Sequence, residues 1–429
     1  MDKLNVLLLG SGGREHAIAW KLGQSDKLGK LYCAPGNPGT EQHAINIELD
    51  ISDFGGVETV VKDLEIDLVI VGPEQPLVDG ISDYLEARSI SVFGPSKAAA
   101  QLEGSKSFAK EFMKRKGIPT AGYRTFSIDA FDEALAFIKK ENRYPVVLKA
   151  DGLAGGKGVF ICESEEETEK RLNLLSEDKN LKDAASTLVV EDFMLGEEAS
   201  VFVICDGNSG KVIHNAQDHK RIGENDTGLN TGGMGAYAPA PLLTESLMTR
   251  IKDEIIEPTI TGMKKDGSPY CGILYVGLMI TKEGPKVVEY NCRFGDPECQ
   301  VILPPLKNDL LDIITAATSK SLQGIEISVS DRSYCSVVLA SGGYPKSYEK
   351  GFAITGIDAC DDDAIIFHSG TKHKDGALVT NGGRVLNVVG SGKTLSEAID
   401  HSYKNVEKIT FKDSYFRRDI GKKGLKKIG

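Results

Sequence analysis

The chain has 429 residues, which is enough for roughly two to four domains with separate cores. Its apolar runs are strand-sized, which excludes a membrane span, and its formal net charge of −11 argues against nucleic acid as a partner. The eight cysteines are scattered without a CxxC pair, and no secretory leader is visible, so we expect a cytoplasmic protein with reduced thiols.

Residues 1–104 alternate between strand and helix patterns. The strands "NVLLLGS", "DLVIVGP" and "ISVFGP" are rich in branched apolar residues, as in parallel sheets that are buried on both faces. The helical patterns "REHAIAWKLGQS" and "PLVDGISDYLEARS" lie between them. This order predicts an α/β domain with an open parallel sheet, whose ligands bind at the carboxyl ends of the strands. Those ends carry "GSGGREH" (10–16), "APGNPGT" (34–40) and "VGPEQPL" (71–77).

The "GSGGRE" turn departs from the dinucleotide-binding fingerprint, because Glu15 stands where the third glycine belongs. It is a weak signal for NAD. The turn leads directly into a helix, so its backbone amides could hold another anion. A tight turn that merely requires glycine explains the pattern equally well.

The stretch "KADGLAGGKGV" (149–159) joins two predicted strands. A Walker loop joins a strand to a helix, but here Asp151 occupies the first-glycine position and Gly158 replaces the Ser/Thr. We therefore expect a glycine-rich hairpin that folds over a ligand as a lid. A surface hairpin with an incidental lysine remains the alternative.

The segment 187–207 reads as strand, short linker and strand. Glu191, Phe193 and Leu195 are placed on the linker, and Glu198 begins the second strand. Such a linker can present backbone groups to a purine edge, and the nearby carboxylate can bind ribose hydroxyls. An edge strand protected by acidic residues would look the same.

The strand in "KVVEYNCRFGDPECQ" (286–300) has one polar face. Strict alternation places Val287, Glu289, Asn291 and Arg293 together, with Val288, Tyr290, Cys292 and Phe294 opposite. A carboxylate and an amide oxygen two residues apart suit Mg²⁺, and Arg293 would reach a transferring phosphoryl group. A solvated sheet face is the plainer alternative, although the acids Asp296 and Glu298 in the next turn weaken it.

These motifs, in this order, resemble the ATP-grasp fold and, more closely, the phosphoribosylamine–glycine ligase family. The matching stretches run from residue 9 to residue 385 and include "GSGGREHA", "APGNPGT", "AQLEGSK", "AQDHKRIG", "NTGGMGAYAPAP", "EYNCRFGDPECQ", "HSGTK" and "TNGGRVL". The resemblance implies an N-terminal α/β domain (1–104), an ATP-grasp domain (105–325) with a flap subdomain at about 121–195, and a small strand-rich C-terminal domain (326–429).

The resemblance also implies that ATP, glycine and 5-phosphoribosylamine give glycinamide ribonucleotide, ADP and phosphate through a glycyl phosphate. It further implies Mg²⁺ or Mn²⁺ as cofactor, small-molecule substrates only, and a monomer. The implied ATP-binding residues are Lys106, Lys149, Gly155, Gly156, Lys157, Gly158, Glu191, Phe193, Leu195 and Glu198. The implied metal ligands are Glu289 and Asn291, and the implied catalytic residues are Arg293 and Asp296. The implied ribosylamine-binding residues are Gly12, Gly13, Glu74, Asp218, Asp296, Lys372 and Arg384.

Two positions depart from the family pattern. Gly156 stands where alanine is common, and Leu229 replaces a more usual proline. Two other functions stay open, namely another ATP-grasp carboxylate ligase, such as a carboxylase, and a nicotinamide-dependent oxidoreductase built on the first domain. A catalytically inactive nucleotide-binding regulator would require a damaged metal strand, but Glu289 and Asn291 are both present.

Overall fold

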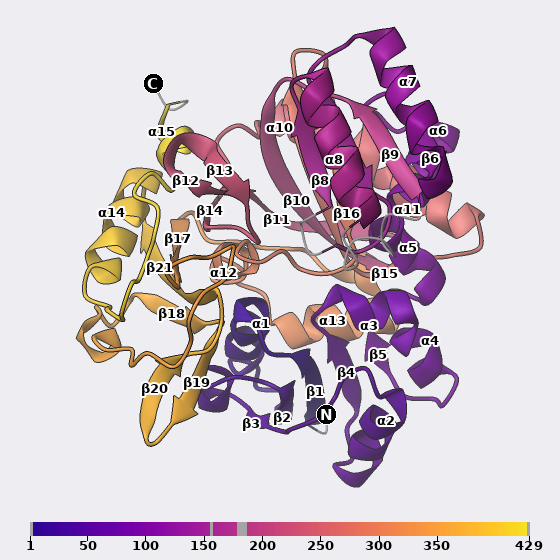
Figure 1. Cartoon of the computed structure of the whole chain (residues 1–429). Helices are drawn as coiled ribbons and strands as arrows, with labels where there is room; N and C mark the ends of the chain where they lie inside the picture. The colour runs from indigo at the N-terminus through magenta and orange to yellow at the C-terminus, as the bar shows by residue number, and fades with distance from the viewer. Residues whose placement is uncertain (1–2, 155–157, 178–186, 427–429) are drawn as a thin grey trace.

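A computed structural model describes residues 3–154, 158–177 and 187–426 (Figure 1). The N-terminal part holds a five-stranded parallel sheet in the order β3-β2-β1-β4-β5. Its strands are β1 (Leu4–Gly10), β2 (Leu28–Pro35), β3 (Ile45–Asn46), β4 (Leu68–Val71) and β5 (Val92–Phe93). Its helices are α1 (Gly13–Leu22), α2 (Phe54–Asp63), α3 (Glu74–Asp79), α4 (Ile81–Glu86) and α5 (Lys97–Gly104). The predicted parallel sheet is confirmed.

Successive residues of β1 serve two separate hydrophobic cores. Leu7 and Leu9 join one buried cluster, while Val6 and Leu8 join the other. This burial on both faces explains the continuous apolar sequence. Because β1 pairs with β2 on one side and β4 on the other, the loops after β1 and β4 lie side by side at the carboxyl edge, where ligands bind in such sheets.

A small antiparallel sheet, ordered β6-β9-β7-β8, follows helix α6 (Lys106–Lys116). Its strands are β6 (Tyr123–Ser127), β7 (Val146–Ala150), β8 (Val159–Cys162) and β9 (Thr187–Asp192). Helices α7 (Phe131–Glu141) and α8 (Glu165–Glu177) cover it, and the subdomain has its own buried cluster (Figure 1). The glycine-rich stretch lies between the paired strands β7 and β8, so the predicted hairpin is confirmed.

The largest sheet has eight strands in the order β16-β15-β10-β11-β14-β17-β21-β18. These are β10 (Glu197–Asp206), β11 (Gly210–Asp218), β14 (Gly235–Ala238), β15 (Cys271–Thr281), β16 (Gly284–Asn291), β17 (Ser333–Ala340), β18 (Ile365–His368) and β21 (Arg384–Gly392). Two ribbons, β12 (Arg221–Gly223) with β13 (Thr227–Asn230) and β19 (Thr371–Lys374) with β20 (Ala377–Thr380), lie outside it.

The helices of this second half are α10 (Glu245–Ile251), α11 (Glu257–Lys265), α12 (Cys299–Ile302), α13 (Leu310–Thr318), α14 (Leu395–Val406) and α15 (Lys422–Leu425), with a π-helical turn at Lys252–Ile256. Short 3₁₀ turns occur at Thr40–Gln42, Ile128–Ala130, Glu224–Asp226, Leu322–Gly324 and Ile357–Ala359. None of the helices described in the structure is both long and apolar enough to cross a bilayer.

The strands of the C-terminal segment extend the sheet of the central part. Strand β14 pairs with β11 on one side and with β17 on the other, so ladder hydrogen bonds cross the predicted limit at residues 325 and 326. The domain limits 1–104, 105–325 and 326–429 stay predictions. The continuous sheet brings the C-terminal segment beside α1 and α12, where the three parts of the chain meet (Figure 1).

Candidate active site

A cavity of about 940 Å³ lies where the N-terminal sheet, the small sheet and the large sheet meet. The predicted residues that line it are Glu74, Lys106, Lys149, Gly158, Glu191, Phe193, Leu195, Glu198, Asp218, Glu289, Asn291, Arg293, Asp296 and Arg384. Gly12, Gly13 and Lys372 are not among its lining residues. Gly155, Gly156 and Lys157 lie outside the described residues, so their predicted contacts stay predictions.

Two lysines share one buried carboxylate. Lys149 of β7 lies 2.9 Å from Glu191 Oε1, and Lys110 of α6 lies 2.9 Å from Glu191 Oε2. Lys149 Nζ also donates to the carbonyl oxygen of Val288 at 3.1 Å. Glu191 thus holds Lys149 in place. Glu191 lies within β9, whereas the sequence analysis placed Glu191 on the linker. Burial lowers the pKa of Lys110 to about 8, although the Glu191 carboxylate opposes that shift.

Lys106 lies at the first position of α6, beside the glycine-rich hairpin. Its Nζ donates to the carbonyl oxygen of Gly152 at 3.0 Å. The Asp151 carboxylate accepts from the Ser107 amide at 2.5 Å and from Ser105 Oγ at 3.0 Å. Asp151, which breaks the Walker pattern, thus ties the hairpin to the N-terminus of α6. Burial lowers the pKa of Lys106, against an opposing effect of Glu289.

A bulge at Val288 corrects the predicted alternation of β16. Gly277 opposes Glu289 while Leu278 opposes Val287, so Val288 is an extra residue in the ladder. Val287 therefore points into the core with Tyr290. The prediction that Val287 and Glu289 share one face is wrong. Glu289 and Asn291 both line the cavity, because they lie beyond the bulge.

Glu289 and Asn291 fit a hard divalent cation. Burial alone would raise the pKa of Glu289, but Lys220, Lys149, Lys106 and Arg293 outweigh it and hold that pKa below its ordinary value. In the amide orientation that satisfies its neighbours, the Asn291 nitrogen donates to Glu103 Oε1 at 2.9 Å. Its oxygen then faces away from Glu103. A carboxylate and an amide oxygen are the donor types that Mg²⁺ prefers.

Arg293 is held between two carboxylates. The sequence analysis did not predict either of these partners for Arg293. Its Nε lies 3.1 Å from Glu74 and its Nη2 lies 3.0 Å from Glu103. Burial would raise the pKa of Glu74, but Arg293 and Arg14 lower it to about 2. The Arg293 guanidinium is therefore fixed in orientation at the wall of the cavity.

The N-terminus of α1 is occupied by carboxylates. Glu15 Oε2 accepts from the Gly12 amide at 2.6 Å, and Asp296 Oδ2 accepts from the Arg14 amide at 3.2 Å. Gly13 packs so tightly that a Cβ there would lie 2.5 Å from Ser369 Oγ. The amides of Gly12 and Arg14 are thus already paired with acids, and the anion-binding role of Gly12 and Gly13 stays a prediction.

Lys372 and Arg384, predicted to hold one phosphate together, are placed differently. Lys372 is exposed on the β19–β20 ribbon (Figure 1) and is not among the residues that line the cavity. Arg384 lines the cavity, where its Nη1 lies 3.2 Å from Asp296 Oδ1 and donates to the Gly232 carbonyl at 2.6 Å. The phosphate contact of Lys372 stays a prediction.

Several lining residues had no assigned role in the sequence analysis: Arg14, Glu103, Lys110, Lys220 and Glu298. Lys220 lies 2.8 Å from Glu198 and 3.8 Å from Glu289. A signal existed for Lys110, which follows Lys106 by four residues and so shares its helix face. Arg14 and Glu103 reach the cavity through tertiary packing alone.

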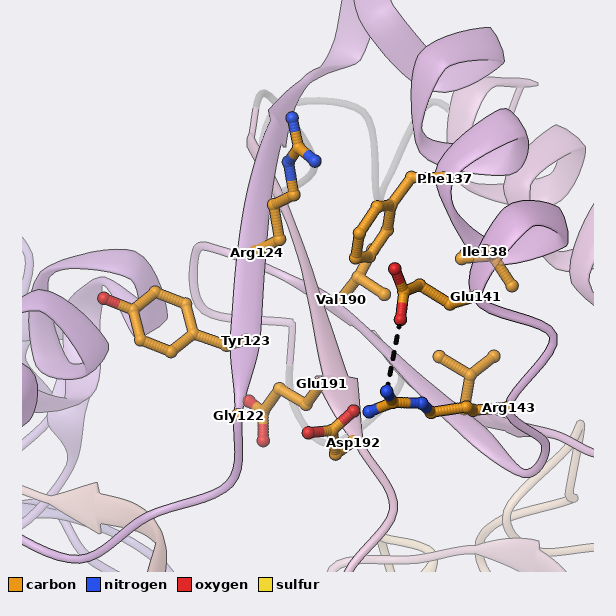
Figure 2. A pocket seen from close by; sticks show the side chains of 11 residues that line it. Gly122, Tyr123, Arg124, Phe137, Ile138, Glu141, Arg143, Val190, Glu191 and Asp192 are labelled. Atoms are coloured by element: carbon orange, nitrogen blue, oxygen red, sulfur yellow. Dashed lines mark ion pairs between the residues drawn. The ribbon is translucent and has the colours of Figure 1, made fainter.

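Figure 2 shows a second, smaller cavity of about 240 Å³ against β9 in the small sheet. Arg124 and Phe137 lie at one end, and Glu141 and Arg143 form an ion pair of 3.5 Å at the other. Arg143 is largely exposed. This cavity contains neither Lys106 nor the Glu289 and Asn291 pair, so the large cavity is the candidate active site.

Models of the phosphoribosylglycinamide synthetase family match nearly the whole chain. The N domain matches residues 4–103, the ATP-grasp (A) domain residues 104–299 and the C domain residues 334–423. A phosphoribosylamine–glycine ligase of Mesorhizobium japonicum is 51% identical over 419 residues, which cover 97% of this chain and 98% of that protein. The trifunctional purine biosynthetic protein adenosine-3 of Gallus gallus is 46% identical over 98% of this chain, but only 42% of its own length is covered.

Solved structures agree with this relationship. The phosphoribosylamine–glycine ligase of Thermotoga maritima has 35% identity and a TM-score of 0.84, covering 97% of this chain and all of that one. A biotin carboxylase domain of Hydrogenobacter thermophilus, solved with MgADP, has 17% identity and a TM-score of 0.73 over 97% of this chain and 92% of that one, which shows a common fold alone. The resemblance seen in the sequence is confirmed, and the chain belongs to the phosphoribosylglycinamide synthetase family.

Proposed function

We propose that this chain ligates glycine to 5-phosphoribosylamine at the expense of ATP, giving glycinamide ribonucleotide, ADP and phosphate in purine biosynthesis. The observation that carries the proposal is the large cavity, which gathers two lysines, a carboxylate–amide pair and a fixed arginine from separate elements. Relatives named phosphoribosylamine–glycine ligase match the chain over almost its full length. The finer assignments below rest on this geometry and on the family resemblance.

In this proposal Lys106 and Lys149 bind the phosphates of ATP, and the backbone between Glu191 and Leu195 holds adenine next to Phe193. Glu198 binds the ribose. Phe193 and Leu195 are exposed apolar side chains at the cavity, where an adenine ring could pack against them. Glu289 and Asn291 would hold Mg²⁺ or Mn²⁺, which, when bound, neutralises phosphate charge.

The carboxylate of glycine is a poor acyl donor, so its oxygen first attacks the γ-phosphorus, forming glycyl phosphate and ADP. Arg293 stabilises the charge on the transferring group, because Glu74 and Glu103 fix its orientation before the reaction. Asp218, Glu74 and Asp296 then bind the amine and hydroxyls of the ribosylamine, and Arg384 binds its phosphate. The chain thus supplies positioning and charge, and no protein nucleophile takes part.

The test is the release of ADP by the purified chain with each substrate omitted in turn. The proposal predicts that sustained ADP release requires both glycine and phosphoribosylamine. Another ATP-grasp carboxylate ligase would release ADP without glycine when given its own acid, for example bicarbonate, and that result would refute the proposal. The oxidoreductase alternative predicts NADH binding, whereas the Glu15 carboxylate at the turn after β1 opposes a pyrophosphate there.

A further inference from the structure

Glu298 is a buried acid that faces the large cavity, and the hydrogen bond that lowers its pKa comes from its own backbone amide. Its side chain is 4% exposed and lines the cavity. It stands at the N-cap of α12, yet it makes no capping hydrogen bond through its side chain. No other side chain within the described part of the chain forms an ion pair or hydrogen bond with its carboxylate. A buried carboxylate in this state is costly unless a ligand or a proton completes it.

The groups around Glu298 come from four elements. Five groups interact electrostatically with Glu298: Asp218 at the end of β11, Lys220 just beyond it, Arg293 after β16, Tyr275 of β15 and Cys299 of α12. Burial raises the pKa of Glu298, and Asp218 raises it further, while Lys220 and Arg293 oppose this. Glu298 is thus an acid whose proton is exchanged near neutral pH, as suits proton transfer.

A structural role does not account for this side chain. Arg293, which lowers the pKa of Glu298, forms its ion pairs with Glu74 and Glu103 instead. Lys220 is paired with Glu198. Among the described residues, the one trio of Asp, Glu, His or Cys side chains close enough to share a metal ion is Asp361, Asp363 and His401, which is remote in sequence from the cavity residues. Glu298 is therefore not part of a three-acid metal cage.

We infer that Glu298 is a catalytic base, which accepts the proton that the ribosylamine nitrogen loses when it attacks glycyl phosphate. This inference rests on the proposed function and adds a residue to it. The nitrogen lone pair forms the new bond to the carbonyl carbon, and the bond from that carbon to the phosphate oxygen breaks with its electron pair. As the new bond forms, the nitrogen releases one proton to the Glu298 carboxylate, phosphate leaves, and the proton passes on to solvent.

Two nucleophiles separate this step from the steps before it. The full chain is supplied with ATP, Mg²⁺ and glycine, and then with either phosphoribosylamine or hydroxylamine. Hydroxylamine intercepts an acyl phosphate as a hydroxamate, and as a small and weakly basic nucleophile it can lose its proton directly to water. For Glu298→Gln we expect ligation to fall by about 100-fold or more, while hydroxamate formation stays close to that of the unchanged chain. Glu298→Asp should recover part of the ligation rate.

The unchanged chain provides a readout that does not depend on a variant folding. Its kcat with phosphoribosylamine should rise with pH through an inflection above the ordinary range of a glutamate, and this inflection should be absent for hydroxamate formation. Glu86→Gln is the matched control, since Glu86 is an exposed acid of α4 whose pKa burial also raises. It should change neither product.

Each outcome decides the matter. Unchanged ligation by Glu298→Gln, an equal loss of both products in a variant with normal thermal unfolding, or the same inflection for both nucleophiles would overturn the inference. If the unchanged chain forms neither product, the proposed function itself is wrong and the inference falls with it.

Discussion

Glu191 shows how one side chain can organise the proposed binding site for ATP phosphates. It pairs with both Lys149 and Lys110 while almost fully buried, and Lys149 is additionally held by the Val288 carbonyl. Removing either member of such a buried pair leaves an uncompensated charge, which is far more costly than the loss of an exposed ion pair. Lys149 is therefore preset in position before any nucleotide binds.

At the residue level, the sequence predicted that the two lysines, Glu289 and Asn291 share one site, because their signals are local. Lys149 precedes a run of glycines, and Glu289 and Asn291 are two residues apart on one strand. Glu103 and Arg14 could not be found in this way, since they reach Arg293 and Glu74 only after α1, α3 and α5 have packed together. The pairing of the Gly12 and Arg14 amides could not be predicted in full either, because one of the two acids, Asp296, lies on a distant segment.

Glu289→Ala tests the proposed metal ligand. We expect ATP turnover to fall by at least about 100-fold at any Mg²⁺ concentration, because the carboxylate would be a direct ligand. The fold should be retained, since the Glu289 side chain faces the cavity. Glu283→Ala, at an exposed acid in the turn between β15 and β16, is the control and should leave turnover unchanged. Equal turnover in both variants would rule out the assignment of Glu289.

Glu74→Gln tests the ion pair with Arg293 through pH. The pKa of Glu74 is about 2 in the folded chain against an ordinary 4.5, so its carboxylate stabilises the fold above about pH 4.5. That stabilisation is lost as the pH falls from about 4.5 toward 2. We expect Glu74→Gln to lower the free energy of unfolding at pH 7 by about 1–3 kcal/mol, seen as a lower melting temperature. The difference in melting temperature between the variant and the unchanged chain should shrink below pH 4.5. A difference that is constant from pH 7 to pH 3 would contradict this account.

At the level of elements, helix α6 and the β7–β8 hairpin form one unit. Asp151 of the hairpin accepts from Ser107 and Ser105 at the start of α6, and Lys106 returns a hydrogen bond to the Gly152 carbonyl. The sequence predicted the hairpin because two strand patterns flank the glycines. It could not give the bulge at Val288, which depends on pairing with β15 and corrects the alternation predicted for β16.

Ser105→Ala, compared with Ser96→Ala, tests whether this unit serves ATP binding. Both serines cap a helix by accepting from an amide three residues on, at 3.1 Å for Ser105 and 3.3 Å for Ser96. Each variant should lose about 1 kcal/mol of stability. Ser105→Ala alone should raise the KM for ATP, since only Ser105 also bonds to Asp151. An unchanged KM in both variants, or an equal rise in both, would show that the cap does not act through the hairpin.

At the scale of the whole molecule, the cavity exists because three parts of the chain close around it. Helix α3, which follows β4 of the parallel sheet, supplies Glu74, the small sheet supplies Lys149, and the large sheet supplies Glu289. The order of these parts was readable from strand and helix patterns and from the family resemblance. That the C-terminal strands continue the large sheet follows only from long-range pairing.

The most direct measurement is a crystal structure of the chain soaked with Mg²⁺ and a non-hydrolysable ATP analogue. The account predicts that the phosphates contact Lys106 and Lys149, that the metal lies between Glu289 and Asn291, and that Arg293 faces the terminal phosphate. A nucleotide bound in the smaller cavity beside β9, or anywhere that leaves Glu289, Asn291 and Arg293 without a ligand, would contradict it.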